Sequence, residues 1–278
     1  MPVFSGELRK MQASLPVSEG DVVQYQMVLG DKRIDLNDFI GDELTLSYSG
    51  DINCVHCSRK TNKSFNQGYC YPCFKSLAQC DQCIMSPEKC HYDAGTCREP
   101  SWGETFCMQD HYVYLANSSG LKVGITRGTQ IPTRWIDQGA VQALPVFRVQ
   151  QRRYAGLVEV ILKQHMTDKT NWRAMLKGNP EWLDLPALFR DVLPRITPEV
   201  EQLQNQYGLQ AIQICDNVKP VSIHFPVSEF PVKVTTRNFD KTPTIDGKLL
   251  GVKGQYLILD TGVLNLRKFG GYHITLSV

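Results

Sequence analysis

The stretch "YVYLANSSGLKVGIT", residues 112–126, lies in the middle of the 278-residue chain and guides the interpretation of what surrounds it. Its outer parts, "YVYL" and "LKVGIT", are rich in the β-branched and aromatic residues that favour strands. The part between them is polar and ends in glycine, which is typical of a turn. The stretch therefore predicts a hairpin of two short strands.

Helical signals follow the hairpin. A short helix is expected from about Pro132, and a strand is expected at residues 143–149, "ALPVFRV". Residues 152–166 then have the apolar spacing of an amphipathic helix. Two further helical patterns lie between residues 182 and about 210. The residues of the amphipathic spacing are Tyr154, Leu157, Val158, Ile161 and Leu162, and those that separate the two later patterns are Pro194 and Pro198.

Strand signals mark both ends of the chain. "VVQYQMVL" and "ELTLSYSG" are β-rich, and short Gly-punctuated strands recur from about residue 217. Neither end is long enough to bury a core alone. We therefore predict an α+β fold in which residues 1–50 and 217–278 join into one discontinuous β domain, a small barrel or sandwich. The intervening units are a cysteine-rich segment (51–111), a small mixed α/β domain (112–178) and a helical extension (179–216).

Nearly all of the 10 cysteines lie between Cys54 and Cys107. The start of the chain has no long apolar segment, so we expect no signal peptide, and such cysteines then favour metal over disulfides. The spacing C-x2-C-x12-C-x2-C points two thiolate pairs at one Zn²⁺ ion. A redox pair or a thiol-rich loop is the alternative. These four cysteines are Cys54, Cys57, Cys70 and Cys73.

A second group offers more than four potential ligands, so a second structural zinc is expected. The spacing does not decide which four residues bind. Cys107 and His111 lie four residues apart, so one turn could present a thiolate and an imidazole together. Buried thiols without a metal are the alternative, and Cys215 is interpreted as a core residue. The candidates are Cys80, Cys83, Cys90, Cys97, Cys107 and His111, with His91 nearby.

The hairpin and the residues after it resemble the GIY-YIG nuclease superfamily. The family's landmarks occur in order as "YVYL", "KVGIT", Arg134 in "PTRWIDQGA", Glu159 in "YAGLVEVILKQH" and Asn171 in "DKTNW". The resemblance covers about residues 112–175. The whole chain also resembles a bacterial family of unknown function that joins a cysteine-rich segment to such a domain.

The resemblance implies a phosphodiesterase site. Tyr114 or its neighbour Tyr112 would lie near the attacking water, and Arg134 would stabilise charge that develops on the phosphate. Glu159 would bind one Mg²⁺ or Mn²⁺ ion. Lys122 replaces the family's second tyrosine, and a lysine donates to phosphate or acts as a base when its pKa is depressed. The histidine that often follows the helix arginine is missing, and Gln138 lies near that place.

Positive charge is concentrated in the same part of the chain. Residues 120–177 carry 10 Lys or Arg and 3 Asp or Glu, a charge of +7 in a chain whose total is +2. A basic module on an otherwise acidic chain is typical of phosphate binding. A solvated basic face is the alternative. The predicted contacts are Arg127, Arg148, Arg152, Arg153 and Lys163.

These patterns together predict a zinc-containing protein that binds DNA or RNA and that is a metal-dependent phosphodiesterase if the catalytic set works. Two alternatives stay open. One is an inactive module that only holds nucleic acid, and the other is a scaffold whose zinc ribbon binds a protein partner. No stretch approaches the roughly 20 apolar residues of a membrane span, so we expect a cytoplasmic protein without a membrane partner.

Overall fold

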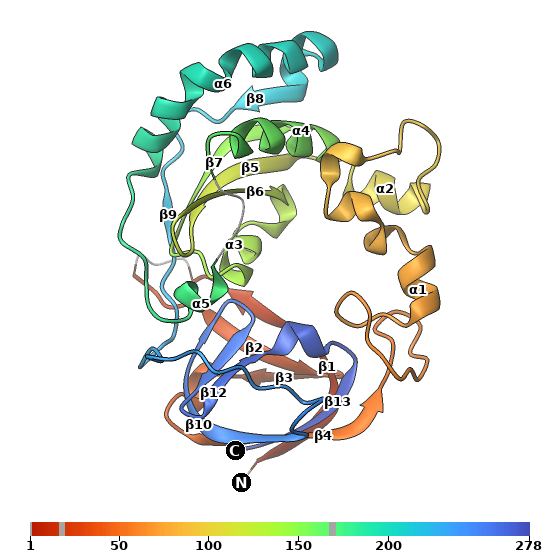
Figure 1. Cartoon of the computed structure of the whole chain (residues 1–278), viewed down its shortest axis with the longest axis vertical. Coiled ribbons are helices and arrows are strands. Elements are labelled where there is room, and N and C mark those ends of the chain that lie inside the picture. Colours follow the sequence, from red (N-terminus) through yellow and green to blue (C-terminus); the bar gives the residue numbers. More distant parts are fainter. Residues whose placement is uncertain (1, 17–19, 167–170) are drawn as a thin grey trace.

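The computed structural model describes residues 2–16, 20–166 and 171–278. Two antiparallel sheets form its framework, as Figure 1 shows. The smaller sheet carries most of the helices, and the larger sheet lies at the other end of the molecule. The cysteine-rich segment runs along one flank between them (Figure 1). The α+β class predicted from the sequence is confirmed.

The larger sheet has 8 strands in the order β12-β11-β10-β4-β13-β1-β2-β3. Both chain ends contribute to it, and the last strand, β13, lies between β4 and β1. Among the described residues no pairing joins β12 to β3, so no closed barrel is found and the predicted barrel or sandwich is not confirmed. The domain boundaries stay a prediction. The strands are β1 (Val3–Ser14), β2 (Gln24–Leu29), β3 (Lys32–Asp35), β4 (Glu43–Ile52), β10 (Thr244–Lys253), β11 (Tyr256–Leu259), β12 (Gly262–Asn265) and β13 (Tyr272–Ser277).

The smaller sheet contains the predicted hairpin. Its order is β6-β5-β7-β8, with β9 also paired to β7. Asn117 pairs with Leu121, and Gly120 between them has a φ of 127°, which L side chains rarely adopt. The strands are β5 (His111–Asn117), β6 (Leu121–Arg127), β7 (Gln142–Val149), β8 (Ile212–Ile214) and β9 (Val221–Ser222).

The two faces of the smaller sheet belong to different cores. Val113 and Leu115 point to the face that α4 (Arg152–Lys163) and α6 (Leu185–Tyr207) cover. Tyr114 and Ala116 alternate with them and join the core of the larger sheet. The short helix α3 (Thr133–Asp137) packs into that shared core with Trp135 and Ile136. Figure 1 shows α3 between the two sheets.

Helix α6 corrects one prediction. Pro194 and Pro198 do not separate two helices, because both lie inside the continuous helix Leu185–Tyr207, and Thr197 is an interior residue. Each proline removes one backbone hydrogen bond. Burial of one apolar face against the sheet compensates for these losses, and the helix ends at Gly208. The buried face consists of Leu185, Phe189, Ile196 and Val200.

Short helices and turns make up the cysteine-rich segment. They are α1 (Tyr71–Ser76), η2 (Ala78–Cys80), η3 (Gln82–Ile84), η4 (Pro87–Lys89) and α2 (Pro100–Phe106). Elsewhere lie α5 (Trp172–Met175) and the turns η1 (Asn37–Phe39), η5 (Gly128–Gln130), η6 (Leu209–Ala211) and η7 (Leu266–Phe269). Of the helices within the described ranges, none is long and apolar enough to cross a bilayer.

The position of β13 inside the larger sheet gives a stability prediction. Leu276 is fully buried, whereas Leu209 is 69% exposed. Leu276→Ala should lower the free energy of unfolding by about 2–5 kcal/mol because it leaves a cavity. The matched change Leu209→Ala should alter it by less than about 0.5 kcal/mol. Urea denaturation followed by circular dichroism measures both, and equal effects would contradict an internal position for the last strand.

Candidate functional site

The cysteines of the first group converge on one point. The sulfurs of Cys54, Cys57, Cys70 and Cys73 all lie within 4.8 Å of one another. Sγ of Cys57 lies 3.7 Å from Sγ of Cys70. A tetrahedral Zn²⁺ with bonds of about 2.3 Å separates its sulfurs by about 3.8 Å, whereas a disulfide requires about 2.05 Å. The donor set therefore fits a metal ion and does not fit disulfides.

The surroundings of this group favour thiolate. Burial raises the pKa of Cys54, but the backbone N–H groups of Cys57, Cys70 and His56 outweigh it and lower the pKa to about 6. Such N–H···S contacts orient and stabilise metal-bound thiolates. Gly68 precedes the second pair with a φ of 138°, and a Cβ there would lie 2.4 Å from a methyl carbon of Val55. A glycine is therefore required at that turn.

The second group of candidates separates in space. Four of its cysteines line one small cavity beside α2, and these are Cys83, Cys90, Cys97 and Cys107. Cys80 instead packs with the first group. His111 is fully buried on β5, where its Nδ1 lies 2.7 Å from the carbonyl oxygen of Gln109. Burial lowers the pKa of His111 to about 4. His111 does not line the cavity.

Tyr114 is the centre of the candidate site on the hairpin. Its ring is fully buried, and its hydroxyl donates to Oε1 of Gln138 over 2.9 Å. Gly124 lies opposite on β6, where a Cβ would come within 2.7 Å of the phenol ring. The glycine of "KVGIT" is therefore required because the tyrosine ring covers it.

Arg134 and Glu159 approach Tyr114 from α3 and α4. Burial raises the pKa of Tyr114; the Arg134 guanidinium opposes this rise, and the Glu159 carboxylate adds to it. Both charges are thus within electrostatic reach of the hydroxyl. Glu159 is only 8% exposed, and its Oε2 lies 3.2 Å from Nζ of Lys163. The structure brings together the three residue types that the resemblance singled out.

The other predicted residues lie farther from this centre or have other contacts. Lys122 is 4% exposed and pairs with Ala116, two residues along β6 from Gly124. Tyr112 is half-buried beside Gly128. Asn171 caps α5, because its side chain accepts a hydrogen bond from the N–H of Ala174.

Three arginines form a group around the candidate site. Burial lowers the pKa of Arg152, and the charges of Arg134 and Arg127 act in the same direction, whereas Cys107 opposes them. Arg127 stacks 4.8 Å from the ring centre of Phe106. Within the described residues, no carboxylate lies within 4.0 Å of any of these three guanidinium groups.

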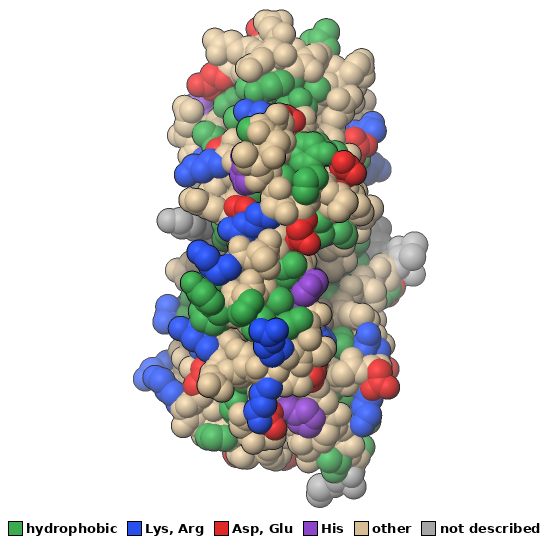
Figure 2. Space-filling view, turned by 90° about the vertical axis from the view of Figure 1, so that its right-hand side faces the viewer, with side chains coloured by type: hydrophobic (Ala, Val, Ile, Leu, Met, Phe, Trp, Pro, Cys, Tyr) green, Lys and Arg blue, Asp and Glu red, His purple; other side chains and the backbone are tan. Residues whose placement is uncertain are grey.

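The remaining predicted phosphate contacts already have acidic partners. Nε of Arg148 donates to Asp110 over 2.8 Å, and Arg153 lies 3.1 Å from Asp93. Lys163 pairs with Glu159. Figure 2 shows the flank that carries the cysteine-rich segment, where Lys and Arg side chains lie in separate groups with acidic and hydrophobic side chains between them. The basic residues therefore do not form one unbroken patch on this face.

No sequence pattern pointed to the contacts of Asp137, the last residue of the helix that carries Arg134. The Asp137 carboxylate is 4% exposed and pairs with Lys10, while Arg267 lies 3.8 Å away. Nε2 of Gln255 donates to Asp137 over 2.9 Å. These partners come from β1, the β10–β11 turn and η7, so Asp137 attaches α3 to the larger sheet. Only an alignment or a structure could have paired residues so distant in sequence.

The chain belongs to the DUF2797 family, described as a protein of unknown function, whose model matches residues 41–274. No match was found among curated proteins or among solved structures. These comparisons do not show a relationship to the GIY-YIG nuclease superfamily, and that relationship stays a proposal.

The first cysteine group yields a prediction about metal content. Cys57→Ser should remove one zinc per chain and lower the thermal denaturation midpoint, because metal binding stabilises the folded state. Cys215→Ser should leave the zinc content and the denaturation midpoint unchanged, since Cys215 belongs to neither group of potential metal ligands found among the described residues. Native mass spectrometry gives the metal count. A wild-type chain that stays folded after chelation with no zinc bound would contradict the assignment.

Proposed function

We propose that this protein is a zinc-containing nucleic-acid-binding protein whose hairpin, α3 and α4 form a GIY-YIG-like, metal-dependent phosphodiesterase site. One observation supports the proposal above others. Arg134 on α3 and Glu159 on α4 both act electrostatically on Tyr114 of β5, although the three residues come from separate elements. A buried tyrosine, a buried carboxylate and a partly exposed arginine in one place are a typical set for phosphoryl chemistry.

Each group has a task in such a reaction. The Arg134 guanidinium donates to phosphate oxygens and stabilises charge that develops there. The Tyr114 hydroxyl, oriented by Gln138, accepts or donates a hydrogen bond near the attacking water. Lys122 on the neighbouring strand adds positive charge. Glu159 would bind Mg²⁺ or Mn²⁺, and that ion would polarise the phosphate and stabilise the leaving oxygen.

The first zinc site has a structural task in this proposal. Gln67 lies between its two cysteine pairs and accepts a hydrogen bond from Nε of Arg267 over 2.5 Å. Arg267 in turn lies beside Asp137 on α3. A metal ion that orders the loop from Cys57 to Cys70 thereby supports the helix that carries Arg134.

A specific observation favours a second function, nucleic-acid binding without cleavage. Tyr114 has no exposed surface, so a water molecule reaches its hydroxyl only if neighbouring side chains move. The arginines Arg127, Arg134 and Arg152 bind phosphate whether or not catalysis occurs. The same surface would then hold DNA or RNA without breaking it.

Cleavage assays separate the two functions. With Mn²⁺ or Mg²⁺ and mixed single- and double-stranded DNA and RNA, wild-type chain should cleave at least one substrate. Arg134→Ala should slow cleavage by about 10²–10³-fold because a donor to the transition state is lost. Glu159→Gln should abolish the cleavage that Mn²⁺ or Mg²⁺ stimulates, because a metal ligand is lost.

The controls carry the same chemical changes at exposed positions on α6. Arg190→Ala and Glu201→Gln should cleave as the wild type does. Cleavage that survives both Arg134→Ala and Glu159→Gln would refute the catalytic assignment. Salt-sensitive binding with no cleavage would support the binding module.

Binding itself gives a further prediction. Arg127→Ala should weaken nucleic-acid affinity and reduce the slope of log K against log salt by about 1, because one phosphate contact is lost. Arg148→Ala should have a smaller effect, since Asp110 already neutralises that charge. Fluorescence anisotropy at several salt concentrations measures both slopes. Equal slopes for Arg127→Ala and wild type would exclude this arginine from the interface.

A further inference from the structure

We propose that Cys83, Cys90, Cys97 and Cys107 bind a second zinc ion, separate from the one at the first cysteine group. The four residues line one cavity of about 10 Å³. That volume is close to what a single water-sized particle occupies. The proposal concerns metal binding alone and does not depend on the proposed phosphodiesterase activity.

The four thiols reach the cavity from separate turns. Cys83 lies on η3, Cys90 directly follows η4, and Cys107 ends α2, where its N–H donates to the carbonyl of Gly103 over 2.7 Å. A Cβ on Gly103 would lie 3.5 Å from Sγ of Cys97. Cys97 therefore lies beside α2 at ordinary van der Waals distance from this position. The cysteine-rich segment has little apolar core of its own, so a metal ion that joins these turns would stabilise its fold.

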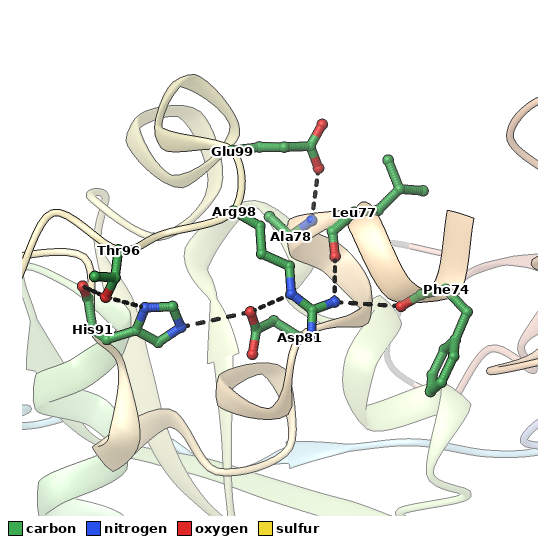
Figure 3. Close-up of polar contacts among 8 residues, drawn as sticks. All are labelled: Phe74, Leu77, Ala78, Asp81, His91, Thr96, Arg98 and Glu99. Atoms are coloured by element: carbon green, nitrogen blue, oxygen red, sulfur yellow. Dashed lines mark hydrogen bonds and ion pairs between the residues drawn. The ribbon is translucent and has the colours of Figure 1, made fainter. Parts of the chain in front are cut away.

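A different trio lies near the same place. Asp81, Cys83 and His91 have ligand atoms within 4.8 Å of one another, whereas no three of the four cysteine sulfurs meet that spacing, so a zinc ion would have to draw these thiolates closer together. Two residues of the trio already serve an ion-pair network, which Figure 3 shows. Nε of Arg98 donates to Asp81 over 2.7 Å, and His91 bonds Thr96 through Nδ1 at 2.8 Å.

That network holds the segment together without a metal. Arg98 also donates to the carbonyl groups of Phe74 and Leu77, which end α1, over 3.3 Å each. Glu99 accepts from the N–H of Ala78 over 2.6 Å (Figure 3). Asp81 is thus the carboxylate that neutralises Arg98, and its use as a ligand would weaken this ion pair. Four soft thiolates are also the better donor set for Zn²⁺.

The proposed centre would also compensate a buried positive charge. Arg152 begins α4, and its guanidinium donates to the carbonyl of Ile84 over 2.7 Å. Its Nε is buried and has no hydrogen-bond partner in the described part of the chain. Cys83 and Cys107 both act electrostatically on Arg152. Four thiolates around Zn²⁺ carry a net charge of −2, which would stabilise this arginine.

The cysteine-rich segment touches α4 at the same point. A Cβ on Gly156 would lie 2.4 Å from the backbone nitrogen of Glu88 in η4. Only glycine allows this close contact of η4 with the helix. The turn between Cys83 and Cys90 is therefore packed directly on the element that carries Glu159.

Native mass spectrometry of the full-length chain tests the proposal. Wild type should hold two zinc ions, Cys97→Ser one, and Cys57→Ser with Cys97→Ser none. Cys215→Ser is the matched control, since it is also half-buried, and should hold two. His91→Ala should hold two as well. One zinc in wild type, or loss of an ion in His91→Ala but not in Cys97→Ser, would overturn the ligand set.

A second measurement uses only wild-type chain, so it does not depend on the folding of variants. Alkylation with iodoacetamide, mapped by peptide mass spectrometry, should leave Cys83, Cys90, Cys97 and Cys107 unmodified until a chelator is added. All four should then react together, while Cys215 reacts at the same rate throughout. Ready modification of Cys90 or Cys97 in zinc-loaded protein would refute a tetrathiolate centre.

Discussion

The contact of Asp137 with the larger sheet is the constraint on which the candidate site depends. The carboxylate is nearly buried. Its charge is stabilised there by Lys10 and Arg267 and by a hydrogen bond from Gln255. Asp137 ends α3, and its neighbours on that helix are the two residues that approach Tyr114. Arg134 lies one turn before it, and Gln138 follows it directly. The geometry around the tyrosine hydroxyl is thus set by a sheet that the two ends of the chain build together.

The cysteine-rich segment reaches the same site from its other side. The first cysteine group connects through Gln67 and Arg267 to Asp137, and the cavity of the second lies against Arg152. Removal of metal would therefore disturb the position of α3 and the charge around α4, even though neither metal site contains a residue of the tyrosine centre. This arrangement gives the cysteine-rich segment a supporting task in either proposed function.

Local patterns predicted local structure well in this chain. The hairpin, the amphipathic helix α4 and the cysteine pairs each depend on residues close in sequence, and the structure contains all of them. The prolines of α6 misled the prediction because a buried apolar face outweighs two lost hydrogen bonds, and burial is not visible from one segment. The pairing of Arg267 with Asp137 spans far too many residues for any sequence pattern to reveal. Separation of Cys80 from its neighbours likewise depends on how turns pack in space.

The group of Arg127, Arg134 and Arg152 is the feature that favours nucleic-acid binding over a scaffold that binds only a protein partner. The charges of Arg134 and Arg127 disfavour the charged form of Arg152, and burial of Arg152 adds a desolvation cost. Arg148 and Arg153 each have an aspartate partner, whereas the described residues place no carboxylate within 4.0 Å of these three guanidinium groups. A bound anion would supply the missing charge and stabilise the fold in proportion to the logarithm of its concentration. If the proposed nucleic-acid binding is correct, stability and phosphate binding would be linked at this site, whether or not Tyr114 and Glu159 also perform chemistry.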